Sequence, residues 1–287
     1  MGKSMAVVMN GNAMSQDIRN QVKSETSHLK DTTGIIPGLA VILVGEDPAS
    51  KIYVKRKEKA CMEVGFISRE YHLPSDASEE TIKTIIHELN HDTAIHGILV
   101  QLPLPKHLNP VAVIEKIDPR KDVDGLHPWN AGRLFTGDPF HVACTPKGVM
   151  EMIDRHKIEI AGKEAVIVGR SNLVGKPLSM LLLNRHATIT VCHTKTKQLA
   201  EVTKRADILI AAVGKPEMIR SDMVKDGTVV IDVGINRLDD GRLIGDVAFD
   251  EVAEKASYIT PVPGGVGLLT VAMLLVNTLK ATSFFEV

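Results

Sequence analysis

The chain of 287 residues has few of the features that mark secreted, membrane-spanning or nucleic-acid-binding proteins. Its 3 cysteines, Cys61, Cys144 and Cys192, are far apart and predict reduced thiols, not a disulfide framework or a zinc site. The net charge of -1 gives no electrostatic reason to expect nucleic acid or an anionic membrane as a partner. The longest apolar run, 266–279, is shorter than the roughly 18–20 residues that span a bilayer.

Targeting signals are also lacking at the start of the sequence. Residues 1–10 show no charged segment followed by a long apolar stretch, so we expect no secretory signal. A myristoylation pattern that begins at Gly2 fails at Ala6, where serine or threonine is required. We therefore expect a cytoplasmic protein, and a domain size of about 150 residues predicts two domains.

Apolar β-rich runs alternate with helical patterns along the chain, which is typical of parallel βαβ units and predicts an α/β fold. Residues 118–146, rich in Asp, Gly, Pro and Asn, predict an ordered loop that ends at Thr145, a helix N-cap before a proline. An Asp-Asp-Gly turn predicts a hairpin over 236–246. We expect strands at 39–45, 66–73, 97–102, 165–168, 188–191, 208–211 and 229–233, and helices at 48–64, 78–91, 145–156 and 267–280.

A strand, a glycine turn and a helix start follow one another over 165–178. Glycine allows the backbone to approach a pyrophosphate, and free N–H groups at a helix N-terminus stabilise its charge. The match to G-x-G-x-x-G is imperfect, because Ser171 replaces the second glycine and Gly175 comes one place late. A tight turn without a ligand is the alternative, but the surrounding βαβ unit favours a Rossmann-like doubly wound sheet that binds a dinucleotide.

The loop after the next strand indicates which dinucleotide binds. Enzymes that use NAD usually place Asp or Glu there to bond the ribose 2′-hydroxyl, whereas residues 192–196 contain no acid. Lys195 and Arg170 provide cations that suit a 2′-phosphate. The pattern favours NADP over NAD, unless both cations are ordinary solvated charges.

Several polar residues of the first half of the chain are candidates for chemistry. Tyr53 and Lys57 lie four residues apart and share a helix face, although a solvated face is the alternative reading of this lysine-rich segment. Gln101 follows an apolar strand at the end where ligands bind in parallel sheets. Asp122 and Asp124 precede a glycine, where carboxylates cap turns, bind metal or accept hydrogen bonds from a heterocycle.

Residues 87–91 match H-E-x-x-H, a pattern of zinc proteases. His87 and His91 fall in the last turn of an expected helix, where positive charge complements the helix dipole, so we expect no metal site. Residues 260–267 combine two prolines with three glycines, which predicts either a rigid linker or a backbone that lies against a ligand.

Together these segments resemble one family, the methylenetetrahydrofolate dehydrogenase/methenyltetrahydrofolate cyclohydrolase proteins in their compact two-activity form. The resemblance covers nearly the whole chain. Its landmarks are the Tyr53-to-Lys57 helix and residues 97–105, 122–126, 144–148, 169–177, 232–236 and 261–267.

The resemblance implies two α/β domains with an active-site cleft between them: 1–142 plus 270–287 for folate and catalysis, and 143–269 for NADP. It implies that Lys57 lies at the one-carbon bridge supported by Gln101, that Tyr53 stacks beside the folate, and that Asp124 binds the pterin. The implied NADP-binding residues are Gly169, Arg170, Ser171, Thr194, Gly214, Ile235 and Thr145, and further implied folate-binding residues are Pro261, Gly264 and Thr270.

The implied reactions are oxidation of 5,10-methylenetetrahydrofolate by NADP and hydrolysis of the methenyl product to 10-formyltetrahydrofolate, without a metal. The implied partners are tetrahydrofolate one-carbon derivatives and a second copy of the chain, joined through the second domain. Two departures from the family pattern are Leu268-Leu269 in place of Pro-Met and Ala143 in place of proline.

Other functions stay open at this point. They are a dehydrogenase-only relative that uses NAD, a two-domain NADP dehydrogenase of the shikimate kind, a cofactor-binding regulator without turnover, and a zinc hydrolase built on His87 and His91.

Overall fold

The computed structural model describes residues 6–284, and the chain divides into two compact units. One unit contains the described residues of Met1–Ser15 together with Thr145–Thr270. The other contains Gln16–Cys144 and the described residues of Val271–Val287. The family resemblance implied that the first residues belong with 16–142, but strand β1 (Val7–Val8) pairs with β11 (Tyr258–Ile259), a strand of the unit of Thr145–Thr270.

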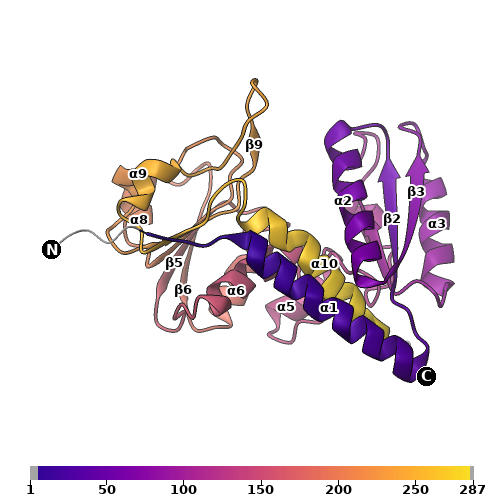
Figure 1. Cartoon of the computed structure of the whole chain (residues 1–287). Helices are drawn as coiled ribbons and strands as arrows, with labels where there is room; N and C mark the ends of the chain where they lie inside the picture. The colour runs from indigo at the N-terminus through magenta and orange to yellow at the C-terminus, as the bar shows by residue number, and fades with distance from the viewer. Residues whose placement is uncertain (1–5, 285–287) are drawn as a thin grey trace. The chain divides into compact units, whose positions relative to one another are not determined.

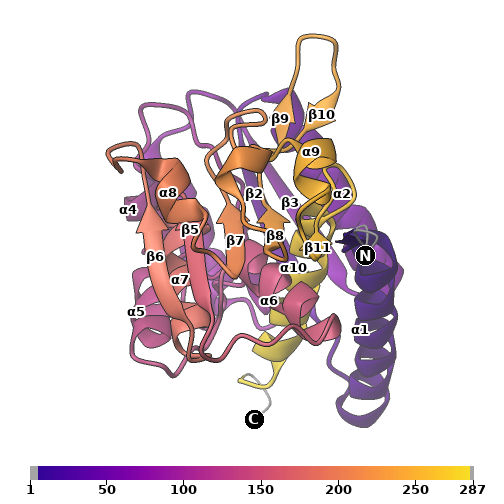
Figure 2. The same ribbon diagram turned by 90° about the vertical axis from the view of Figure 1, so that its left-hand side faces the viewer.

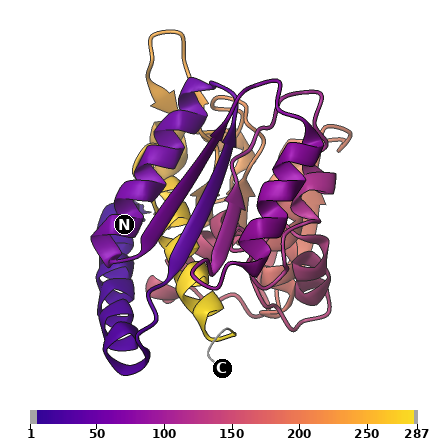
Figure 3. The same ribbon diagram turned by 90° about the vertical axis from the view of Figure 1, so that its right-hand side faces the viewer.

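The unit built from Gln16–Cys144 contains a three-stranded parallel sheet with the order β3-β2-β4. Its strands are β2 (Gly38–Val44), β3 (Ile67–Leu73) and β4 (Gly97–Val100). Helices α2 (Pro48–Val64) and α3 (Glu79–His91) lie on opposite sides of the sheet (Figures 1 and 3). Every residue of β2 is buried, as its unbroken apolar sequence requires when both faces of a strand are covered.

Both helices have clear start signals in the sequence. The Asp47 side chain accepts a hydrogen bond of 2.8 Å from the amide of Ser50, and Pro48 occupies the first position of α2. Ser78 caps α3 in the same way, with a 3.1 Å bond from the amide of Thr81. The helices expected at 48–64 and 78–91 are therefore confirmed.

Three further helices of this region were not predicted. The long helix α1 (Gly11–Thr33) begins in the unit of Thr145–Thr270 and continues into the unit of Gln16–Cys144. Helices α4 (Pro110–Ile114) and α5 (Pro128–Phe135) are short. The prediction of a loop over 118–146 was wrong for α5, which the His127 side chain caps by accepting a bond from the amide of Trp129.

The unit of Thr145–Thr270 with the described residues up to Ser15 contains a parallel six-stranded sheet with the order β1-β11-β8-β7-β5-β6, and Figure 2 shows its strands from β6 to β11 (Tyr258–Ile259). Its central strands are β5 (Glu164–Val168), β7 (Ile208–Ala211) and β8 (Val229–Asp232). Strand β6 (Thr188–Cys192) lies on one side of β5 and β7 on the other. The chain order therefore reverses between β5 and β7, and such a switch point is where doubly wound sheets bind ligands.

The predicted parallel sheet and the predicted hairpin are both confirmed. Strands β9 (Asn236–Arg237) and β10 (Leu243–Ile244) pair in antiparallel fashion and form the projecting loop of Figure 2. The remaining elements are α6 (Cys144–Arg155), α7 (Gly175–Leu183), α8 (Leu199–Thr203), a 3₁₀ turn (Ser221–Met223), α9 (Phe249–Ala253), β11 (Tyr258–Ile259) and α10 (Val266–Thr282).

Helix α6 begins one residue earlier than the sequence predicted. Because Cys144 is already helical, Thr145 is not the N-cap. Its hydroxyl instead lies 3.0 Å from the hydroxyl of Thr270. No helix within residues 6–284 is both long and apolar enough to cross a membrane.

Candidate active site

Lys57 and Gln101 form the closest pair among the predicted catalytic residues. The Lys57 ammonium donates a hydrogen bond of 2.8 Å to Oε1 of Gln101. Gln101, only 8% exposed, follows β4, and its Nε2 donates to the carbonyl of Leu102 at 2.7 Å. That second bond turns the amide oxygen toward Lys57. The structure therefore brings together two residues that lie 44 positions apart.

The surroundings of Lys57 weaken its hold on a proton. Burial lowers the pKa of Lys57 below its usual value of 10.5, and the negative charge of Asp124 opposes this shift. Lysine with a lowered pKa is partly neutral nearer to physiological pH, so it is able to accept a proton. Lys57 is half-buried, whereas its helix neighbours Lys55 and Arg56 are exposed, so it differs from the solvated face that was the alternative interpretation of this segment.

Tyr53 lies one turn before Lys57 on helix α2 and is 40% exposed. A half-exposed ring at this position offers a flat surface for stacking. The helix places the phenol and the amine on the same face, as their spacing predicts.

The two aspartates of the 122–126 segment have different surroundings. Asp122 is buried, and its carboxylate accepts hydrogen bonds from the amides of Leu126 and His127 and from Nδ2 of Asn130. Burial raises the pKa of Asp122, while these donors oppose the rise. Asp122 therefore caps the turn. Asp124 is partly buried, and its negative charge raises the pKa of Lys57.

Helix α10 supports this segment through a residue that the sequence did not single out. Nδ2 of the buried Asn277 donates to the carbonyls of Val123 and Val142 at 2.8 and 3.0 Å. Gly125 approaches the same backbone so closely that a Cβ would lie 2.5 Å from the amide nitrogen of Ala143. The only sequence signal for Asn277 is that a polar residue interrupts an apolar helical segment. No sequence pattern indicates that its side chain binds the carbonyls of Val123 and Val142.

In the other unit, the glycine turn follows β5 at the switch point of the sheet. Gly169 has a φ of 130°, and a Cβ there would lie 2.2 Å from the carbonyl oxygen of Ala212. A Cβ on Gly175 would lie 2.1 Å from the carbonyl oxygen of Gly169. Both positions therefore require glycine, which confirms the tight turn predicted between strand and helix.

Helix α7 begins directly after the glycine turn. Its N-cap residue, Val174, makes no side-chain capping bond. Ser171 accepts a bond from the Val174 amide at 3.1 Å, and the side chains of Arg170 and Ser171 are exposed. The Lys176 amide already donates to the carbonyl of Ser171 at 3.0 Å, and Pro177 has no N–H, so the Gly175 amide and the exposed Arg170 are the groups here that suit a phosphate.

The loop after β6 is held by its own polar groups. The amide of His193 donates to the hydroxyl of Thr196 at 2.9 Å, and the amide of Lys195 donates to Nδ1 of His193 at 3.1 Å. Thr194 and Lys195 are exposed at the tip of this turn. The loop presents a hydroxyl and an ammonium group without a carboxylate, which suits a phosphate on the ribose.

Two buried carboxylates, absent from the predicted site, organise the ends of β7 and β8. Asp246 accepts bonds from the backbone amides of residues 213–215, including that of Gly214. Asp232 accepts from the amides of Gly234, Asp246 and Val247. Burial raises the pKa of Asp232 to about 6. No sequence pattern indicates these contacts, because the hydrogen-bond donors are backbone amides.

The remaining predicted residues belong to the same unit: Ile235, Pro261 and Gly264 lie on loops, and Thr270 lies in helix α10. Ile235 follows β8 and is 48% exposed. Gly264 has a φ of 106°, and its carbonyl accepts a bond from the amide of Gly11 at 2.7 Å. Pro261 and Thr270 are partly buried on either side of it. Residues 260–267 are thus fixed by backbone contacts with the start of α1.

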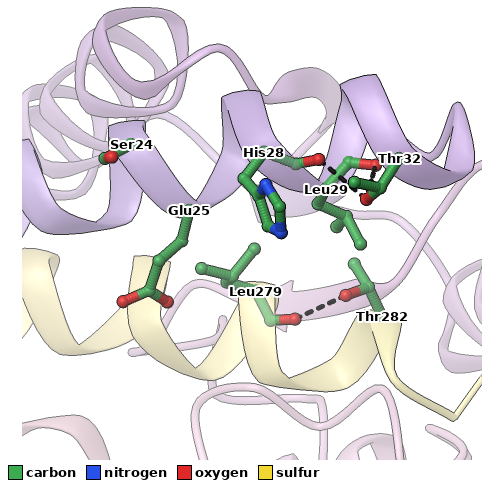
Figure 4. A pocket seen from close by; sticks show the side chains of 7 residues that line it. All are labelled: Ser24, Glu25, His28, Leu29, Thr32, Leu279 and Thr282. Carbon is green, nitrogen blue, oxygen red and sulfur yellow. Dashed lines mark hydrogen bonds between the residues drawn. The ribbon is translucent and has the colours of Figure 1, made fainter.

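The H-E-x-x-H histidines belong to helix α3 of the unit of Gln16–Cys144. His87 and His91 are exposed on α3, where Nδ1 of His91 bonds the carbonyl of His87 at 2.8 Å. Within residues 6–284, no three His, Cys, Asp or Glu side chains gather to hold a metal. A shallow hollow of about 490 Å³ between α1 and α10 contains none of the predicted site residues (Figure 4).

Taken together, the switch-point glycine turn and the acid-free loop after β6 define a dinucleotide-binding α/β protein, and the Lys57–Gln101 pair adds a catalytic lysine candidate. Comparison with known proteins identifies the group more closely. The catalytic-domain model of tetrahydrofolate dehydrogenase/cyclohydrolase matches residues 9–124, and the NAD(P)-binding-domain model of the same family matches 143–285. The chain belongs to the tetrahydrofolate dehydrogenase/cyclohydrolase family.

Individual relatives are similar over nearly their whole length. "Bifunctional protein FolD" of Geotalea uraniireducens is 55% identical over 277 residues, 96% of this chain and 99% of the relative. The crystal structure of the bifunctional FolD enzyme of Campylobacter jejuni has a TM-score of 0.96 at 50% identity, covering 97% of this chain and 99% of that one. FolD of Trypanosoma brucei, solved with NADP and an inhibitor, has a TM-score of 0.94 at 40% identity and 98% coverage of both chains.

Proposed function

We propose that this chain oxidises 5,10-methylenetetrahydrofolate with NADP and hydrolyses the resulting 5,10-methenyltetrahydrofolate to 10-formyltetrahydrofolate. The family match and identities above 50% to bifunctional relatives support both activities. The observation that carries the proposal is the Lys57–Gln101 hydrogen bond of 2.8 Å beside the charge of Asp124.

The described residues fit NADP. Gly169 and Gly175 let the turn pack tightly against neighbouring backbone, which places the start of α7 beside the exposed Arg170 and Ser171 as a site that suits a pyrophosphate. We propose that Gly169, Arg170 and Ser171 hold the phosphates and that Thr194 faces the ribose. NADP, when bound, supplies the hydride acceptor for the first reaction. Further proposed contacts come from Gly214, Ile235 and Thr145.

Lys57 is the proposed proton-handling group of the second reaction. In its neutral form, which burial favours, the amine accepts a proton from the water that attacks the methenyl carbon. The Gln101 amide keeps Nζ in place, because its own Nε2 is anchored on the Leu102 carbonyl. The cationic methenyl carbon is the electrophile, so this account needs no metal.

Substrate binding is proposed for residues of both units. Asp124 accepts hydrogen bonds from the pterin, and the half-exposed Tyr53 ring stacks on the folate. Pro261, Gly264 and Thr270 contribute further folate contacts. We propose that the unit of Gln16–Cys144 and Val271–Val287 is the folate domain and that the unit of Met1–Ser15 and Thr145–Thr270 is the NADP domain.

We also propose a homodimer joined through the NADP domain, and action in the cytoplasm. The three buried cysteines form no disulfide, which is consistent with a reducing compartment. We expect small folates and NADP as partners, and neither nucleic acid nor a membrane.

Titration of the purified chain with NADP and, separately, with NAD tests the function. Oxidation of methylenetetrahydrofolate and decay of methenyltetrahydrofolate are followed as two signals. We expect both reactions, with a higher kcat/KM for NADP than for NAD. Oxidation without methenyl decay would instead identify a dehydrogenase-only enzyme.

A further inference from the structure

The loop that follows β7 lies directly against the glycine turn that follows β5. The amide of Ala212 donates to the carbonyl of Val168 at 2.8 Å, and Gly169 is so close to Ala212 that only glycine fits there. The loop at 213–215 therefore forms the second wall of the switch point. Its exact placement decides the shape available to a dinucleotide.

A single buried carboxylate determines that placement. Oδ2 of Asp246 accepts from the amides of Val213 and Gly214 at 2.6 and 2.9 Å, and Oδ1 accepts from the amide of Lys215 at 2.9 Å. Nδ2 of Asn236 donates to the same Oδ1 at 2.9 Å. Asp246 is fully buried, so these charge-assisted bonds are shielded from water.

Three successive amide N–H groups around a left-handed glycine form a concave anion site of the kind that binds phosphate. Here Gly214 has a φ of 65°, and the carboxylate of Asp246 already occupies the concave side. A phosphate is excluded from these amides by the bonded carboxylate and by its charge. The pyrophosphate is thereby directed to the other wall, the N-terminus of α7.

Asp246 is itself held by a second carboxylate. Asp232, at the end of β8, accepts from the amide of Asp246 at 3.0 Å and from that of Val247 at 2.8 Å. A Cβ on Gly245 would lie 1.8 Å from Oδ2 of Asp232, and a Cβ on Gly234 would lie 2.3 Å from Oδ1 of Asp246. The two glycines permit the carboxylates to sit against the backbone, and the ends of β7 and β8 become one rigid unit.

We propose that Asp246 is a positioning residue for NADP: its carboxylate fills the amide nest at 213–215 and fixes that loop as the wall opposite the α7 phosphate site. The inference rests on the proposed function and deepens it. Asp246 does not itself touch the cofactor. It acts through the Gly214 loop and through Asn236, the neighbour of Ile235.

Asp246→Asn tests the proposal in the full-length chain, with Asp250→Asn as the matched control because Asp250 is an exposed aspartate four residues later. NADP affinity is measured by calorimetry, and methenyl hydrolysis without NADP is measured on the same sample. We expect the NADP Kd of Asp246→Asn to rise about tenfold, the equivalent of ~1.4 kcal/mol. Hydrolysis and the kcat of oxidation at saturating NADP should stay within about twofold of wild type, since a positioning residue changes binding before chemistry.

An unchanged NADP Kd in folded Asp246→Asn overturns the proposal. If that variant does not fold, the NADP Kd of Asn236→Ala tests the proposal instead. This substitution removes one donor to Asp246 and leaves the backbone bonds in place. A rise of about threefold in its Kd supports the proposal, and no rise overturns it. If the wild-type chain fails to bind NADP, both the proposed function and this inference are overturned. If wild type binds NADP and the variant binds it equally well, only this inference is overturned.

Discussion

Nζ of Lys57 on helix α2 and Oε1 of Gln101 after strand β4 are joined by a hydrogen bond of 2.8 Å. The lysine is thereby held by a neutral acceptor, while the charge that favours its protonated form comes from Asp124. A neutral partner fixes the position of the amine without stabilising its positive charge as strongly as a carboxylate would. Gln101 thus positions the amine, while Asp124 influences its pKa, so a change of the Asp124 charge has a predictable effect on the pKa of Lys57.

Asp124→Asn should move the pH dependence of hydrolysis. Burial lowers the pKa of Lys57 and the charge of Asp124 raises it, so removal of that charge lowers the pKa further. Because the neutral amine is the active form, the rising limb of kcat/KM for methenyl hydrolysis should shift to lower pH. Asp76→Asn, at an exposed position of the same unit, should leave the limb in place. A shift to higher pH would contradict the assigned charge interaction.

Thr194→Asp should reverse the preference for NADP. The substitution introduces a carboxylate into a loop that has none, where it would repel a 2′-phosphate and suit a 2′-hydroxyl. We expect kcat/KM for NADP to fall by about tenfold or more, with NAD affected much less. Thr188→Asp, at an exposed position near the other end of β6, is the control and should leave the ratio unaltered. Equal losses with both cofactors would show that Thr194 does not face the ribose.

Gly125→Ala should destabilise the chain more than Gly137→Ala. Both glycines are left-handed, with φ values of 71° and 86°, so both substitutions carry the same type of backbone strain. At Gly125 the added Cβ also meets the backbone of Val142 and Ala143 at 2.5 Å, whereas nothing lies within 4 Å at Gly137. We expect a difference of ~1–3 kcal/mol in the free energy of unfolding, measured by urea denaturation. Equal losses would contradict the close approach.

Much of the fold could be predicted because its signals are local. The strand at 208–211 and the helix at 48–64 have the predicted bounds, since the apolar run and the Asp47–Pro48 start signal require no distant partner. Helix α1 escaped prediction because its buried face contains Ser15 and Thr26 among its few apolar positions. A weak apolar stripe of this kind does not differ enough from a solvated segment.

The candidate site was only partly predictable for a similar reason. Lys57 and Gln101 stand out by residue type and by their place at element ends, and the structure joins them. Asp246 and Asn277 act on backbone groups many residues away, so no spacing in the sequence indicates their roles. At Thr145 a local sequence signal was misleading. The residue was predicted as an N-cap, but it lies within helix α6 and its hydroxyl contacts the hydroxyl of Thr270.

The central claim is that Lys57 performs the proton transfer of hydrolysis, and Lys57→Met tests it most directly, with the exposed Lys55→Met as control. Methionine retains the length of the side chain and removes its basic group. The account predicts that methenyl hydrolysis falls by roughly two to four orders of magnitude while the Kd for NADP stays unchanged. Hydrolysis at the wild-type rate in folded Lys57→Met would contradict it.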